Sequence, residues 1–92
     1  MIYKYGLNYN TTSLTLPKSS KLLSVGFQGD NLVLWVDTSP NEPEELMLYA
    51  YTTGSEVKKG HVYVGTAMTA DGTFVLHVYR DFSMCDLFKG MF

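Results

Sequence analysis

Hydrophobic and polar side chains alternate with a period of two along most of the chain. This spacing sends successive side chains to opposite faces of a β-sheet, so it predicts strands. Near the N-terminus, tyrosines and a leucine occupy alternate positions of residues 3–9, and Leu14 and Leu16 repeat the pattern before Pro17. Proline removes a ladder hydrogen bond and is typical of a strand end or edge. The first part of the chain therefore predicts two short strands.

Two further alternating segments, residues 21–28 and 31–37, flank Gly29-Asp30. Glycine at the first central position of a tight turn supplies the positive φ that a type II′ hairpin requires. In this register the core-facing pairs are Phe27 with Leu32, Val25 with Leu34 and Leu23 with Val36. A turn centred on Asp30-Asn31 would shift the pairing but leave the alternation within each strand unchanged.

The second half of the chain begins with a polar loop over residues 38–45, which contains two prolines and three glutamates. Residues 45–53 then predict a strand with Leu46, Leu48 and Ala50 on one face and Met47, Tyr49 and Tyr51 on the other. Residues 61–70 and 73–80 predict a second hairpin, because Asp71-Gly72 between them is a strong turn signal. A two-residue turn there pairs Thr66 with His77, Met68 with Val75 and Val64 with Tyr79.

Beyond Arg80 the hydrophobic period changes to that of a helix. Met84, Leu87, Phe88 and Met91 lie three or four residues apart, which predicts a short C-terminal helix. We therefore expect residues 1–92 to form a single domain, with a β-rich body over 1–80 and a helical tail over 81–92. The expected fold is mainly β: a small antiparallel sandwich or partly open barrel of six to seven short strands with one C-terminal helix.

Composition narrows the classes of partner. Seven basic residues stand against nine acidic ones, and Lys58-Lys59 is the only basic pair, so we expect no direct nucleic-acid binding. No apolar run approaches the about 18 residues of a membrane span, and the first residues do not resemble a secretory signal. The single cysteine, Cys85, excludes an internal disulfide and suits a reducing compartment. These features predict a cytoplasmic protein that does not enter a membrane.

Several short motifs follow one another in a characteristic order. They are Pro17, Leu23-Ser24-Val25, Leu34-Trp35, Thr53-Gly54, Tyr63-Val64-Gly65-Thr66 and His77-Val78-Tyr79. In this order, over about residues 2–80, the chain resembles a small domain family of unknown function found in tailed bacteriophages and prophages. Ser55 stands where the family pattern has a histidine, and residues 81–92 have no counterpart in it. The resemblance implies a phage origin and the cytoplasm of an infected bacterial host, and it implies no activity or cofactor.

The residues able to carry chemistry do not form a recognisable motif. Metal sites need three or four ligands at suitable spacing, and His61, His77 and Cys85 do not provide it. We expect His77 to be a hydrogen-bonded strand residue, His61 to be solvated, and Cys85 to pack as a small hydrophobic side chain instead of acting as a nucleophile with His77. The glutamates at positions 42, 44 and 45 lie in or beside the polar loop. The sequence therefore predicts no enzyme, no metal and no cofactor.

The aromatic residues are the most informative about binding. Seven tyrosines, five phenylalanines and one tryptophan exceed what one core face can take. Trp35, Met47, Tyr49 and Tyr51 form one candidate surface if their strands are neighbours in the sheet. Tryptophan, tyrosine and methionine are enriched at protein interfaces. A second core, under the helix or the first strand, explains the same residues equally well.

Three functions fit these features. The leading hypothesis is a non-enzymatic phage accessory protein that binds and inhibits a host bacterial protein, a defence component being one candidate target. The second is sequestration of a small nucleotide-like signal, for which Lys58, Lys59 and Arg80 are the candidate ligand-binding residues. The third is a small structural component of the virion, which predicts a homo-oligomer formed through free sheet edges and the terminal helix.

Overall fold

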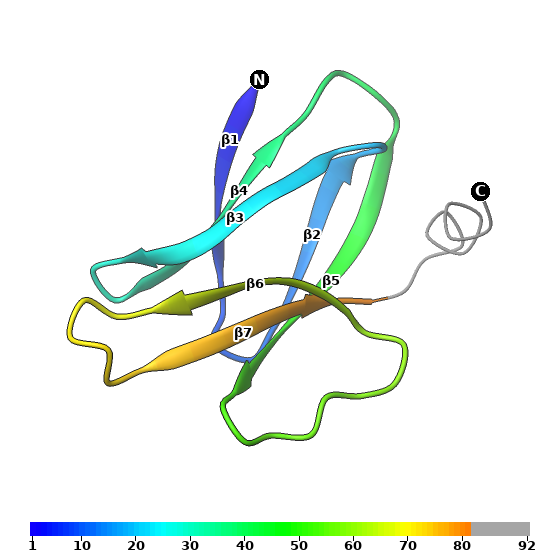
Figure 1. Cartoon of the computed structure of the whole chain (residues 1–92). Helices are drawn as coiled ribbons and strands as arrows, with labels where there is room; N and C mark the ends of the chain where they lie inside the picture. The colour runs from blue at the N-terminus through cyan, green and yellow to red at the C-terminus, as the bar shows by residue number, and fades with distance from the viewer. Residues whose placement is uncertain (82–92) are drawn as a thin grey trace.

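Two antiparallel β-sheets pack face to face in the computed structural model, which describes residues 1–81 (Figure 1). The described residues contain seven strands: β1 (Ile2–Leu7), β2 (Thr11–Pro17), β3 (Lys21–Gln28), β4 (Asn31–Asp37), β5 (Pro43–Thr52), β6 (Val62–Met68) and β7 (Val75–Arg80). The first sheet has the strand order β1-β4-β3, and the second has the order β2-β5-β7-β6. The mainly β fold is thus confirmed. The two sheets stay open and do not close into a barrel, and the helix expected from Met84 to Met91 lies outside the described residues.

The core fills the space between the two sheets. Its buried side chains come from alternate positions of strands in both sheets, as the period of two predicts. They are Leu16, Val25, Leu32, Leu34, Val36, Leu48, Ala67, Leu76 and Val78. Tyr5 and Leu7 of β1 pack against this cluster from the edge of the first sheet.

The β3-β4 hairpin follows the predicted register only near its turn. Phe27 pairs with Leu32 and Val25 with Leu34, and Gly29 has a φ of 61°. Further along, a β-bulge places two residues of β3 opposite one of β4, so that Leu22 pairs with Val36 and Leu23 is 43% exposed. The predicted pairing of Leu23 with Val36 is therefore wrong, because the extra residue turns Leu23 toward solvent.

The β6-β7 hairpin also follows the predicted register only near its turn. Thr66 pairs with His77 and Met68 with Val75, as predicted. The turn itself spans Thr69 to Gly72, where the Gly72 N–H donates to the Thr69 carbonyl at 2.8 Å and Gly72 has a φ of 73°. The loop is thus longer than the two-residue turn expected at Asp71-Gly72.

A second bulge interrupts this hairpin beyond Gly65. It places Tyr63, and not Val64, opposite Tyr79. The predicted pairing of Val64 with Tyr79 is wrong for the same reason as that of Leu23, namely one extra residue in the strand.

Gly65 brings the two sheets into direct contact. A Cβ atom at this position would lie 2.8 Å from Cγ2 of Val25, which is closer than real Cβ contacts occur. Only glycine therefore allows β6 of the second sheet to approach β3 of the first this closely. Figure 1 shows these two strands side by side. The contact therefore sets the distance between the two sheets where β3 and β6 meet.

Candidate functional site

The outward face of the second sheet gathers aromatic side chains from three neighbouring strands. Tyr49 and Tyr51 of β5 lie on the face of that strand opposite its core-facing side chains. The antiparallel register sets Tyr49 opposite Tyr79 of β7. Tyr79 in turn faces Tyr63 of β6, because the bulge turns Tyr63 outward. We call these four tyrosines, together with His61, the tyrosine face.

The rings of the tyrosine face contact one another. Tyr79 lies between Tyr51 and Tyr63, with ring centroids 5.5 and 5.4 Å apart and edge-to-face geometry in both pairs. His61 stacks on Tyr49 at a centroid distance of 4.1 Å and an interplanar angle of 15°. Such ring pairs contribute about 0.5–1.5 kcal/mol each beyond the area they bury. The face is therefore an ordered array of rings and not a set of separate side chains.

Hydrogen bonds hold the segment between β5 and β6 against the tyrosine face. His61 Nδ1 lies 2.8 Å from the hydroxyl of Tyr51, and the backbone N–H of Lys58 donates to the same hydroxyl at 3.4 Å. The sequence suggested that His61 is only solvated, but the structure makes it a half-buried part of the tyrosine face. Its position three residues before the bulged Val64 of β6 gave no sign of the stacking partner on β5.

His77 has a protein partner at each ring nitrogen. Its Nδ1 lies 3.0 Å from the Thr66 hydroxyl, and its Nε2 lies 2.9 Å from the Thr53 hydroxyl. The Thr66 hydroxyl also lies 2.6 Å from the hydroxyl of Tyr63. A neutral imidazole needs one donor and one acceptor, and hydroxyl groups supply either. His77 thus joins the tyrosine face to the loop after β5 through hydrogen bonds, as a hydrogen-bonded strand residue.

The structure separates the four residues of the predicted aromatic surface. Met47, Tyr49 and Tyr51 lie on the outward face of the second sheet. Trp35 belongs to β4 in the first sheet, where its ring covers Gly26 and its Cζ3 lies 3.4 Å from the place of a glycine Cβ. Since β4 and β5 are in different sheets, Trp35 does not extend the surface formed by the other three residues.

The structure also separates the three basic residues that were predicted to bind a ligand. Lys58 and Lys59 are exposed in the segment between β5 and β6. Arg80, at the end of β7, instead lines a pocket together with Lys18 and Lys21. Sequence reasoning missed these two lysines, because they are about sixty residues from Arg80 and only the sheet topology brings them near it.

The acidic residues are placed as structural or solvated groups. Glu42 forms an exposed ion pair with Lys18 at 3.2 Å. The Asp71 carboxylate accepts hydrogen bonds from the backbone N–H of Thr73 and from the hydroxyls of Thr69 and Thr73, and these bonds lower its pKa. Within residues 1–81, no group of three histidine, cysteine or acidic side chains is arranged to hold a metal ion. The same residues include no helix of the length and apolarity needed to cross a membrane.

Comparison with known proteins adds one finding. A family model described as "Domain of unknown function (DUF7352)" matches residues 1–83. The chain belongs to this family. No curated protein and no solved structure matches the chain. The expected resemblance to a domain family of unknown function is confirmed in this form, and residues 84–92 of this DUF7352 chain lie beyond the matched range.

Proposed function

We propose that this DUF7352 domain is a small non-enzymatic accessory protein of phage origin that binds and inhibits a host protein in the cytoplasm of the infected bacterium. The binding surface is the tyrosine face. The observation that carries the proposal is the ring array of Tyr49, Tyr51, Tyr63, Tyr79 and His61 on the outward side of the second sheet.

The composition of the face supports recognition of a protein. Tyrosine is enriched among the residues that dominate interface energetics, because one side chain offers a large apolar ring and a hydrogen-bonding hydroxyl. Tyr63 is 55% exposed, and Met68 on the same strand is 58% exposed. Both therefore offer apolar surface that a partner would remove from water.

The tyrosine face also favours tight binding because its side chains are already held in place. Tyr51 is fixed by His61, and Tyr63 is tied through Thr66 to His77. Side chains that already occupy one conformation lose less entropy when a partner binds. The hydrogen bonds of the two histidines therefore contribute to recognition by holding the tyrosine side chains in place.

The test compares two tyrosines of similar exposure on different sheets. Tyr63 is 55% exposed on the second sheet, and Tyr3 is 46% exposed on the first. The tagged full chain and its variants Tyr63→Ala and Tyr3→Ala are produced in a bacterial host, captured gently and analysed by native mass spectrometry. Any captured protein is then purified, and its affinity for each variant is measured, with circular dichroism as the control for folding.

The expected result is a loss of at least tenfold in affinity for Tyr63→Ala and less than threefold for Tyr3→Ala, because a central interface tyrosine costs about 2 kcal/mol or more when truncated. An equal loss in both variants would reject the tyrosine face as the binding surface. A symmetric oligomer with no bound protein would instead favour a structural role in the virion.

A further inference from the structure

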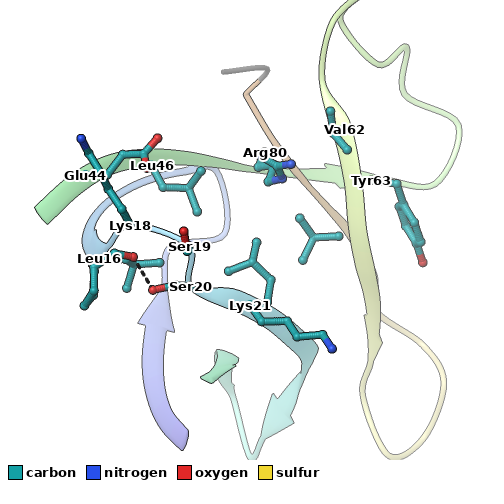
Figure 2. Close-up of a pocket in the computed structure, with 13 residues that line it drawn as sticks. Leu16, Lys18, Ser19, Ser20, Lys21, Glu44, Leu46, Val62, Tyr63 and Arg80 are labelled. Atoms are coloured by element: carbon teal, nitrogen blue, oxygen red, sulfur yellow. Dashed lines mark hydrogen bonds between the residues drawn. The ribbon is translucent and has the colours of Figure 1, made fainter. Parts of the chain in front are cut away.

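A pocket lies at one end of the sandwich, where the turn between β2 and β3 meets β5, β6 and the end of β7 (Figure 2). Its volume is about 460 Å³. Pockets that bind small molecules in proteins have volumes of about 300–1,000 Å³. The size therefore suits a small ligand, and the position is distinct from the centre of the tyrosine face.

Both β-bulges adjoin this pocket. Leu22 precedes the bulge of β3, Val64 is the extra residue of β6, and both line the pocket. A bulge bends its strand, increases the local twist and is common beside binding sites. Next to the bulges, Gly65 holds the two strands in close contact through Val25. The pocket thus begins where two neighbouring strands both leave regular pairing.

The apolar part of the lining is aliphatic. It consists of Leu16, Pro17, Leu22, Leu46, Val62 and Val64. Among residues 1–81, Tyr63 is the one aromatic residue of the lining, and Figure 2 shows its ring pointing away from the other labelled side chains. The described lining thus offers a nucleobase no ring to stack on inside the pocket, whereas an alkyl chain would match its aliphatic side chains.

The charged part of the lining is mainly basic. In the part of the chain that the structure describes, Lys18, Lys21 and Arg80 line the pocket against one carboxylate, Glu44, although the whole chain has a net charge of −2. Arg80 follows Leu76 and Val78 on the side of β7 that faces the core, and in Figure 2 it lies between Leu46 and Val62. Lys18 already pairs with Glu42, and Arg80 also contacts other groups of the protein. Lys21 is therefore the first candidate for binding an anionic group.

We propose that this pocket binds a small amphipathic anion, with one carboxylate or phosphate group beside Lys21 and an aliphatic body against the leucines and valines. Charge-assisted hydrogen bonds from lysine and arginine are the usual way to bind such head groups. The inference does not rest on the tyrosine face, because Lys21, Arg80 and the aliphatic lining lie outside it.

In the experiment, the full chain is titrated with sodium decanoate below its critical micelle concentration. Calorimetry measures the affinity, and two-dimensional NMR records which backbone signals shift. Sodium octanoate tests the aliphatic body, decyltrimethylammonium has the same chain with the opposite charge, and adenosine monophosphate represents a nucleotide. Lys21→Gln is compared with Lys59→Gln, since Lys59 is also an exposed lysine but does not line the pocket.

Decanoate is expected to bind and to shift the backbone signals of Lys21, Leu22, Val64 and Arg80. Each buried methylene strengthens binding about fourfold, so octanoate, which is two methylenes shorter, should bind about sixteenfold more weakly. Lys21→Gln should weaken decanoate binding at least fivefold, because a hydrogen bond to a charged group is lost, and Lys59→Gln should leave it unchanged.

Three results would overturn the proposal. Equal binding of decanoate and decyltrimethylammonium would show that the head group is not recognised. Binding of adenosine monophosphate with the same signal changes, without binding of decanoate, would refute the aliphatic body. No response to decanoate would show that the pocket does not bind an amphipathic anion.

Discussion

Replacing Gly65 with alanine tests the contact that joins the two sheets. The new Cβ would lie 2.8 Å from Cγ2 of Val25, whereas ordinary van der Waals contact begins at 3.4 Å. Val25 is 8% exposed, and its β-branched side chain has few alternative rotamers in a strand. The clash is therefore relieved only if the backbones of β3 and β6 move apart.

The cost follows from overpacking. Inserting a methyl group into a well-packed core destabilises a protein by about 1–3 kcal/mol. Alanine is otherwise favoured over glycine inside a strand by about 0.5–1 kcal/mol, which offsets part of this loss. A net loss of about 1–2 kcal/mol lowers the melting temperature of a domain of this size by about 4–16 °C.

Thermal and urea denaturation followed by circular dichroism measure the effect of Gly65→Ala. Gly6→Ala is the matched control, because nothing lies within 4 Å of a Cβ at this strand position, and it should not be destabilising. The double variant Gly65→Ala/Val25→Ala should cost less than the sum of the single variants, since the contacting methyl group is gone. If Gly65→Ala is as stable as Gly6→Ala, or if the two single costs are additive, the close approach of β3 and β6 is refuted.

Two other outcomes follow from the first bulge and from the second hairpin's turn. Leu22→Ala should lower the free energy of unfolding by about 2 kcal/mol and Leu23→Ala by less than about 0.5 kcal/mol, because the bulge turns Leu22 toward the core and Leu23 toward solvent. Urea denaturation measures both costs. A larger cost for Leu23→Ala than for Leu22→Ala would contradict the bulge. Hydrogen bonds lower the pKa of Asp71 below 3.8, so its contribution to stability is present above this pH and is lost as the pH falls through the folded-state pKa. An NMR titration of the carboxyl group should have its midpoint below 3.8, and Asp71→Asn should abolish this part of the acid dependence; a midpoint at or above 3.8 would contradict the turn geometry.

Strand identity and local register could be predicted from the sequence because turn chemistry and alternation act over a few residues. Gly29 fixed the pairing of Phe27 with Leu32 by its positive φ. The bulge at Leu23 could not be predicted, since Leu22 and Leu23 are adjacent and both apolar, and either satisfies the alternating pattern. The choice between them depends on the opposite sheet.

The candidate sites show the same limit. Alternation correctly placed Met47, Tyr49 and Tyr51 on one face of a strand. The neighbours of that strand depend on sheet topology, which put β7 beside β5 and placed Trp35 in the other sheet. Local patterns carry no information about such long-range pairing.

The pocket likewise depends on long-range pairing. Lys18 lies in the turn between β2 and β3, Lys21 begins β3, and Arg80 ends β7, about sixty residues further along the chain. The sequence contains Lys18, Lys21 and Arg80 but no spacing that marks them as one site.

The affinity of the captured protein for the two tyrosine variants tests the central claim most directly. If the tyrosine face is the binding surface, Tyr63→Ala loses at least tenfold in affinity while it remains folded, and Tyr3→Ala loses less than threefold. If Tyr63→Ala is folded and binds with unchanged affinity, the partner does not dock on the tyrosine face, and the proposed function is contradicted at its central residue.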